Sequence, residues 1–418
     1  MGLIMAGGIV LVGALAFCAY YLAFAPRWRV RVRAIIATLV VLALGVAALA
    51  LLLMVRWFDY PLVSWRPFTI AALLALPVVG YVGLGLAGVA VIDLIWRGVG
   101  RVRRASASVV PQGSTTADEA ADTLPRRLVF LRWATCLVTV AAVGVTGFGY
   151  ARAHEPAITP VTVTSSQLPP AFDGYRVALL TDLHIGPGLS GEFLRHVVDE
   201  TNAARPDLIV IAGDVVDGFV AQLSGELTPL SDLRAPDGVL VVTGNREYFA
   251  GRPSDWIVAF RSLGLTVLDN NGVTLNRAGA TIDVLGIGDR MGPGTTASNL
   301  ALADRRLRDT VGPRSHFRIL AVHEPLQVLA DSEGDYVPVD GEGLAATLDV
   351  DLALCGHTHG GQMWPVQALV FLQQPVLAGV HDLAGVTTVT SRGVGALGPP
   401  VRVGAPPEIP LITLHVAA

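Results

Sequence analysis

Seven side chains of the kind that bind divalent metal ions follow five β-rich segments of this chain. Each segment is nearly continuous Val, Ile and Leu, which is typical of a buried strand. In an open α/β sheet, ligands bind beyond the carboxyl ends of the strands. We therefore expect these side chains to converge on one edge. They are Asp182 and His184 in TDLHIG, Asp214 in GDVVDG, Asn245 in GNREYF, His323 in VHEP, and His357 and His359 in GHTHGGQ.

The residue types indicate which metals would bind. Carboxylate, amide and imidazole groups form a mixed hard and borderline ligand set that suits divalent Mn, Fe or Zn and not a soft metal held by thiolates. Seven ligands suffice for two ions, which in two-metal sites lie about 3.5–4 Å apart and share a bridging group. A carboxylate is the natural bridge. Glycines beside Asp214, Asn245 and His357 would let the backbone approach the site closely. On a strand, His357 and His359 would share one face.

The segments from Tyr175 onward alternate between strand and helix patterns, which predicts an α/β fold. A helix is expected over 190–204, with Ser190 as its N-cap. The strand candidates are 175–182, 207–214, 238–245, 281–289, 317–324, 351–359 and 385–391.

Taken in order, the five blocks resemble the signature blocks of the calcineurin-like metallophosphoesterases, D-x-H, G-D-x-x-D, G-N-H-D/E, H and G-H-x-H. The GHTHGGQ block behind a membrane-spanning N-terminus is similar to a membrane-anchored bacterial subgroup. The resemblance covers about residues 170 to 416. It implies a four-layer α/β/β/α metallophosphoesterase sandwich with two mixed sheets, which we expect over 172–418.

The resemblance also implies which residue holds which ion. Asp214 would bridge the two ions and act in catalysis with Asn245. A water between the two cations would lose a proton near neutral pH, and the resulting hydroxide would attack phosphorus in line. The first ion would take Asp182, His184, Asp214 and His359, and the second would take Asp214, Asn245, His323 and His357.

One position departs from the family pattern. The family has a His after the Asn of the third block, and this chain has Arg246. Arg cannot act as a general acid, because its pKa exceeds about 12, but it can hold a phosphate oxygen through two hydrogen bonds. We therefore predict a catalytic role for Arg246 as a phosphate clamp. Leaving-group assistance would be weakened or moved to a water or to Glu247. Asp217 is expected to support the ligands from behind, as is Glu247.

The N-terminal third has the composition of a membrane region. Hydrophobic residues make up 52% of the chain, and about 20 apolar residues cross a bilayer as a helix. We predict a four-helix transmembrane region over 1–151, a flexible loop over 105–125 and a linker over 152–171. The four predicted spans are 2–25, 34–55, 68–92 and 128–150.

Arginine placement predicts the orientation, because positive charge stays in the cytoplasm. Ten arginines follow the first and third spans, whereas Arg56, Arg66 and Arg152 border the opposite side. The chain is therefore expected to be a multi-pass cell-membrane protein with an extracytoplasmic catalytic domain. Its partners would be the lipid bilayer and a phosphate-ester substrate, lipid-linked or derived from the envelope. The ten arginines that follow the first and third spans are Arg27, Arg29, Arg31, Arg33, Arg97, Arg101, Arg103, Arg104, Arg126 and Arg127.

Other functions fit less well. The three cysteines are scattered, which argues against a disulfide framework or a Cys-based zinc site. The soluble part has no basic cluster with interleaved aromatics, so nucleic acid is not an expected partner. Two alternatives stay open, a broad extracytoplasmic phosphatase and a non-catalytic membrane protein with a vestigial metal site. The oligomeric state does not follow from the sequence.

Overall fold

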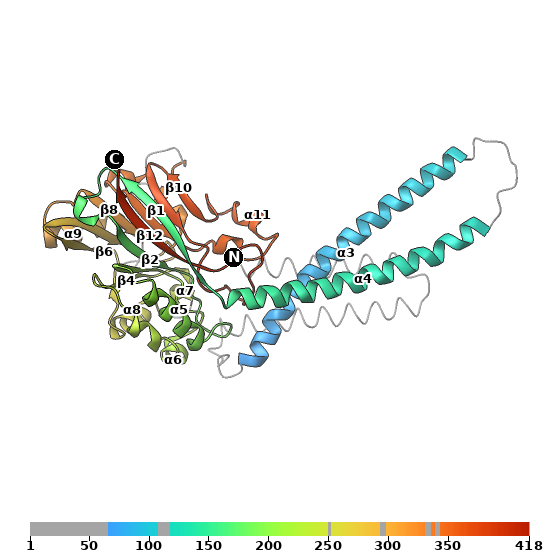
Figure 1. The fold of residues 1–418 in the computed structure, drawn as a ribbon, viewed down its shortest axis with the longest axis horizontal. Helices are drawn as coiled ribbons and strands as arrows, with labels where there is room; N and C mark the ends of the chain where they lie inside the picture. Colours follow the sequence, from blue (N-terminus) through green and yellow to red (C-terminus); the bar gives the residue numbers. More distant parts are fainter. Residues whose placement is uncertain are drawn as a thin grey trace. The chain divides into compact units, whose positions relative to one another are not determined.

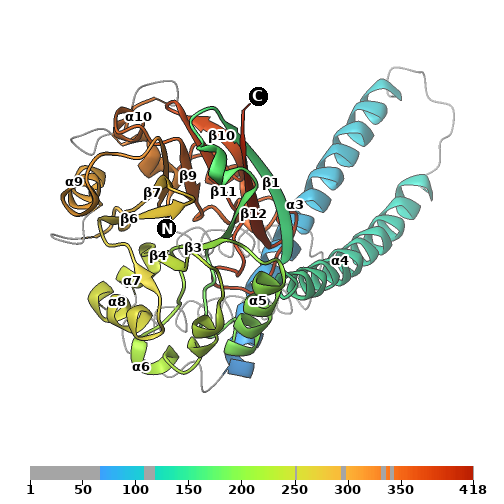
Figure 2. The same ribbon diagram turned by 60° about the vertical axis from the view of Figure 1, so that its left-hand side comes forward.

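The computed structural model describes residues 66–107, 118–249, 252–292, 298–330, 336–338 and 343–417. These residues fall into two compact units. Of the described residues, the first unit contains those within Ala71–Phe148, and the second contains 66–70 and those within Gly149–Ala418. Figures 1 and 2 show the helices of the first unit and the sheets of the second.

Two long helices dominate the first unit, α3 (Arg66–Ala107) and α4 (Asp118–Ala153). The stretches Arg66–Val102 and Val129–Ala153 are long and apolar enough to cross a membrane. Only 28% and 18% of their apolar windows are buried, whereas the core helix of a soluble domain would be mostly covered. The predicted spans 68–92 and 128–150 lie in these helices, and the predicted spans 2–25 and 34–55 lie outside the described residues.

The prediction of a flexible loop over 105–125 was wrong at both ends. Helix α3 continues to Ala107, and α4 already begins at Asp118.

In the part of the chain that the structure describes, the second unit contains two mixed six-stranded sheets, in the orders β1-β12-β2-β3-β4-β5 and β10-β11-β9-β8-β7-β6. Strands β2 to β5 run parallel, as do β11, β9, β8 and β7, whereas β12, β10 and β6 each pair antiparallel with a neighbour. The strands are β1 (Ala157–Ser165), β2 (Tyr175–Leu180), β3 (Leu208–Ala212), β4 (Val239–Val242), β5 (Thr266–Val267), β6 (Asn271–Arg277), β7 (Ala280–Gly286), β8 (Phe317–Ala321), β9 (Leu352–Cys355), β10 (Gly379–Leu383), β11 (Val386–Thr390) and β12 (Glu408–Val416).

Three cores separate four layers. The inner faces of both sheets share one core, in which Val210 and Leu240 meet Val284 and Ile319. Helices α5, α6 and α8 cover the outer face of the first sheet, and α9 and α10 cover that of the second (Figure 2). The predicted α/β/β/α sandwich is therefore confirmed. The helices are α5 (Gly191–Ala203), α6 (Val220–Leu223), α7 (Asn245–Phe249), α8 (Pro253–Ser262), α9 (Leu300–Val311), α10 (Leu344–Thr347) and α11 (Gln367–Val370).

All seven strand candidates form strands, and the helix predicted over 190–204 is α5. Its N-cap Ser190 accepts a hydrogen bond from the Phe193 N–H. The prediction of a linker over 152–171 was wrong, because this segment contains β1, which pairs in parallel with β12 at the edge of the first sheet (Figure 1). Its β-branched residues alternate with polar ones, a pattern that favours a strand.

Candidate metal centre

All seven predicted ligands come together where strands end. Asp182 lies two residues beyond β2, Asp214 two beyond β3, and His323 two beyond β8. Asn245 opens α7 just after β4, and His357 follows β9. Because both sheets direct strand ends to the same place, loops far apart in the sequence can share one site.

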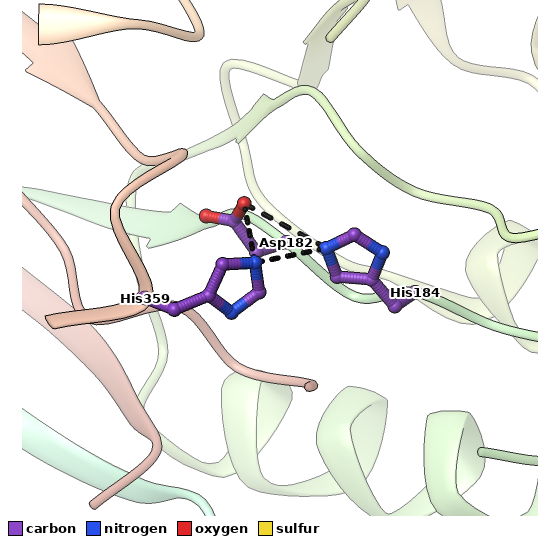
Figure 3. Close-up of side chains that lie close together, drawn as sticks. All are labelled: Asp182, His184 and His359. Carbon is purple, nitrogen blue, oxygen red and sulfur yellow. Dashed lines mark hydrogen bonds and ion pairs between the residues drawn. The ribbon is translucent and has the colours of Figure 1, made fainter. Parts of the chain in front are cut away.

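The first group of candidate ligands consists of Asp182, His184 and His359, and Figure 3 shows their polar atoms directed at one another. The Nε2 atoms of the two histidines lie 3.0 Å apart. The Asp182 Oδ1 atom lies 3.3 Å from Nε2 of His359 and 3.9 Å from Nε2 of His184. One cation in the centre of this group could bind all three side chains.

The second group consists of Asn245, His323 and His357. The Asn245 Oδ1 atom lies 3.2 Å from Nε2 of His323 and 3.1 Å from Nδ1 of His357. These two histidine nitrogens are themselves 3.2 Å apart. His357 and His359 therefore belong to different groups, although one residue separates them in the sequence.

Asp214 lies between the two groups. Its Oδ2 atom is 3.7 Å from Nε2 of His184, and its Oδ1 atom is 3.3 Å from Nε2 of His323. Each carboxylate oxygen thus faces one group, as a bridging carboxylate would. Asp182 also reaches toward the second group, because it forms a potential metal-binding cluster with Asp214 and His323.

Hydrogen bonds behind two histidines fix the nitrogen that faces the centre. The Nδ1 atom of His184 lies 3.0 Å from the Asp217 carboxylate, and Nδ1 of His323 lies 2.8 Å from the Ala212 carbonyl oxygen. These acceptors keep a proton on Nδ1, so the lone pair of Nε2 is available to a metal. The contact to His184 agrees with the predicted supporting role of Asp217.

The donor atoms fit a cation. The Asp182 Oδ2 atom accepts hydrogen bonds from the His357 N–H at 2.9 Å and the Thr181 hydroxyl at 2.8 Å, but Oδ1 is buried and accepts none. A buried carboxylate oxygen without a partner is costly. A metal ion beside Oδ1 would satisfy it together with the facing nitrogens of His184 and His359.

Five candidate ligands have a left-handed backbone, with φ between 48° and 71°. This conformation is uncommon outside glycine, costs about 1–3 kcal/mol per residue and clusters at functional sites. The expectation that His357 and His359 share a strand face was wrong, because β9 ends at Cys355 and His359 begins the 3-10 turn η5 (His359–Gly361). The five candidate ligands with a left-handed backbone are Asp182, His184, Asp214, His357 and His359.

Two glycines show why the loops can approach so closely. A Cβ on Gly356 would lie 1.8 Å from the Thr181 hydroxyl oxygen, and one on Gly244 would lie 2.4 Å from the Asp214 backbone nitrogen. No side chain fits at either position. The predicted role of these glycines is therefore confirmed.

The buried carboxylates and imidazoles alter one another's proton affinity. Burial lowers the pKa of His184, but Asp217, Asp182 and Asp214 outweigh it and raise the pKa to about 9. For His359, burial dominates and lowers the pKa to about 4, although Asp182 opposes it. Burial alone would raise the pKa of Asp214, yet the neighbouring histidines hold it well below its ordinary value.

Arg246 lies at the edge of the centre. Its backbone N–H donates to Asp214 Oδ1 at 2.7 Å, and its Nε atom lies 3.3 Å from Asp217 Oδ1. Asp217 therefore contacts both Arg246 and His184, and connects the guanidinium to the first group. The Arg246 side chain is 23% exposed, so part of it can meet a substrate.

Glu247 supports the loops around the centre, and its burial, together with Asp214, raises the pKa of its carboxyl group to about 8. Its carboxylate accepts hydrogen bonds from three backbone N–H groups, those of Asp214, Val215 and Gly244. The side chain is fully buried, because these loops enclose it. The position of Glu247 behind the ligands agrees with its predicted supporting role, and its part in leaving-group assistance stays a prediction.

Sequence reasoning missed two residues that contact ligands. Glu324 lies 3.8 Å from Nε2 of His357 and is held by Arg290 and Gln374. Arg402 is buried and donates to the backbone oxygen of His359 at 2.7 Å. The position of Glu324 beside His323 was the one available signal, and nothing near Arg402 in the sequence marks it.

Comparisons with known proteins agree with this geometry. A model of the calcineurin-like phosphoesterase family matches residues 175–361. The uncharacterized metallophosphoesterase YkuE of Bacillus subtilis is 31% identical over 285 residues, which cover 64% of this chain and 90% of that protein. The chain belongs to the metallophosphoesterase family.

Two animal relatives of this metallophosphoesterase are also similar. A transmembrane protein with metallophosphoesterase domain from Bos taurus is 30% identical over 70% of this chain, and one of the same name from Danio rerio is 29% identical over 69%. The alignments cover 64% of each animal protein, so this chain spans just under two thirds of their length.

Proposed function

We propose that this metallophosphoesterase is a membrane-anchored enzyme that hydrolyses phosphodiester or phosphomonoester bonds with two divalent ions, Mn, Fe or Zn. The observation that supports it most strongly is the position of Asp214. Its two oxygens face two separate histidine pairs, at 3.7 Å and 3.3 Å. A single-ion site would need only one of these pairs.

Each residue of the centre has a part in the proposal. Two cations, when bound, would supply a hydroxide near neutral pH and would neutralise the phosphate oxygens. Asp182, His184 and His359 would hold one ion, Asn245, His323 and His357 would hold the other, and Asp214 would be a ligand of both.

Arg246 binds a phosphate oxygen of the substrate in this proposal. Its side chain is 23% exposed and its Nε atom lies beside Asp217, and a planar guanidinium can form two parallel hydrogen bonds to phosphate. Arg246 does not protonate a leaving group, and Glu247 is enclosed. Diesters are therefore the preferred substrates in this proposal.

The membrane helices favour a lipid-linked or envelope-derived substrate on the extracytoplasmic side. Arg66, at the start of α3, belongs to the same compact unit as the metal centre. Its Nη2 atom lies 3.1 Å from the Glu226 carboxylate and 3.1 Å from the Gly186 carbonyl oxygen. This contact at the start of α3 supports the proposal that this end of the helix and the phosphoesterase domain lie on the same side of the membrane.

A paired assay tests the chemistry. Full-length protein in nanodiscs would be metal-stripped, reloaded with Mn or Zn, and assayed on bis-p-nitrophenyl phosphate and p-nitrophenyl phosphate. We expect a chelator to abolish hydrolysis, and we expect the diester to be hydrolysed faster than the monoester. Asp214→Asn should abolish it, and Asp199→Asn, on the exposed face of α5, should not. Equal activity of both variants would refute the proposal, and a faster monoester rate would favour a broad phosphatase.

Reporter fusions test the orientation. A reporter active only outside the cytoplasm should be silent at residue 110 and active at residue 418. The reverse pattern would exclude an extracytoplasmic substrate without bearing on the metal chemistry.

A further inference from the structure

An apolar surface lies beside the metal centre, on α11 and the turns around it. Four large side chains there are exposed, Trp364 by 62%, Leu369 by 37%, Phe371 by 59% and Leu372 by 79%. We name these four residues the apolar shelf. Helix α11 has no buried residue, so it contributes nothing to the core of the domain.

The sequence around the apolar shelf also lacks charge. From Gly360 to Val380 it contains no Asp, Glu, Lys or Arg. A surface that faces water normally intersperses both signs of charge, and a contiguous apolar patch indicates an interaction site. The segment 360–380 therefore has the composition of an interaction surface.

The shelf is joined to the end of the membrane helix α4. The Trp364 N–H donates to the Val403 carbonyl oxygen at 2.8 Å, and the Arg402 N–H donates to the Gly149 carbonyl oxygen at 2.9 Å. A Cβ on Gly149 would lie 2.7 Å from side-chain atoms of both Val401 and Val403, so these valines pack on the helix backbone. All these residues belong to the second compact unit.

The apolar candidate span of α4 ends at this point. Gly149 lies within the apolar stretch Val129–Ala153, and β1 starts at Ala157. A strip of the domain, Val401–Val403, therefore contacts the last turns of the candidate span on one side and the shelf on the other. Within the second compact unit, the shelf and the residues from Gly149 to the end of α4 therefore meet the same strip of the domain.

We propose that the apolar shelf inserts into the headgroup and upper acyl region of the bilayer that α4 crosses. Trp side chains are enriched at this depth, and short amphipathic segments bury apolar side chains there. The inference rests on the membrane anchoring in the proposed function and is independent of catalysis. It also places the metal centre at the lipid surface, because ligand His359 begins the turn η5, and Gly361 of that turn packs on Gln367 of α11.

Depth-dependent quenching tests the proposal in the full-length chain. Cys18 and Cys136 would be replaced by serine, whereas Cys355 is fully buried and can stay. An environment-sensitive fluorophore would be attached at Leu372→Cys, at Phe371→Cys as a second position, and at Val258→Cys as the control. Val258 is 65% exposed and lies on α8. Nanodiscs of equal parts phosphatidylcholine and phosphatidylglycerol would hold one chain each, with or without a lipid carrying a nitroxide high on its acyl chain.

The expected result is that the nitroxide lipid lowers emission from positions 371 and 372 by about twofold or more and leaves position 258 unchanged. Aqueous iodide should quench position 258 only. Equal iodide quenching at all three positions would show that the shelf faces water and would overturn the proposal. Protection at 371 and 372 only when a disc holds two chains would assign the shelf to a second copy and would overturn it as well. Phosphoesterase activity does not enter either readout.

Discussion

The two halves of the metal centre differ in how tightly the protein encloses them. In the first half, Asp182, His184 and His359 are all buried, and charged side chains support the histidines from behind. In the second half, Asn245 is partly exposed and the His357 side chain is 23% exposed. A backbone carbonyl supports His323 there. The first half is thus the more rigid and the second the more open.

This difference assigns separate roles to the two ions. An ion among buried, fixed ligands should bind first and exchange slowly, because its ligands are already ordered. An ion in the open half should exchange faster and meet the substrate. Asp214 connects the two halves, so its loss should affect both.

Asp214→Asn should have the largest effect. Loss of the bridging charge is expected to reduce kcat/KM by about a thousandfold or more, which corresponds to about 4 kcal/mol. Steady-state kinetics on the diester, beside the Asp199→Asn control, would measure it. A loss below about tenfold would mean that Asp214 does not bridge.

Asn245→Ala should separate the halves. The second ion is expected to be lost while the first stays, because Asn245 contacts only His323 and His357 among the candidate ligands. Calorimetric titration of metal-free protein would give one bound ion in place of two, and Asn271→Ala, at an exposed strand position, would keep two. Loss of both ions in Asn245→Ala would contradict the division.

Asp217→Asn should weaken the first half without emptying it. The amide keeps the shape but loses the charge that faces Nδ1 of His184, and such supporting residues contribute about 10- to 100-fold in metal affinity. Competition with a chelating dye measures the tighter affinity. An unchanged affinity for the first ion would show that Asp217 serves Arg246 alone.

Metal binding should depend on pH in both halves, because nearby carboxylates outweigh burial and raise the pKa of His184 in the first half and of His323 in the second. Without metal, His184 keeps its proton up to about pH 9, and a cation must displace that proton. The affinity of the first ion should therefore rise by up to about tenfold per pH unit from pH 6.5 and level off near pH 9. His359, with a pKa of about 4, adds no dependence in this range. Dye competition across this range would check the slope, and a flat profile would contradict it.

The centre could be predicted from sequence because its ligands lie in short blocks after apolar runs. Parallel strands direct such blocks to one edge, so proximity follows from the strand pattern alone. The supporting contacts could not be predicted. Arg402 meets His359, and Gln374 meets Glu324, through folding that brings distant loops together. Arg246 was recognised as a departure, but its pairing with Asp217 depends on the start of α7.

The fold shows the same limit. Strands with buried runs were predicted, whereas β1 was assigned to a linker, because its partner β12 lies at the opposite end of the domain sequence. An edge strand has a weak apolar pattern, and its pairing is non-local. The left-handed conformation of His357 and His359 was missed for a related reason, since the glycines that permit it also fit an ordinary turn.

Magnetic coupling between two bound manganese ions tests the central claim most directly. Metal-free full-length protein in nanodiscs would be titrated with Mn²⁺ and followed by electron paramagnetic resonance. Two ions per chain with an exchange-coupled spectrum, which collapses to isolated Mn²⁺ signals in Asp214→Asn, is the predicted result. Isolated signals throughout the titration of the unmodified protein, or no bound manganese at all, would contradict a centre bridged by Asp214.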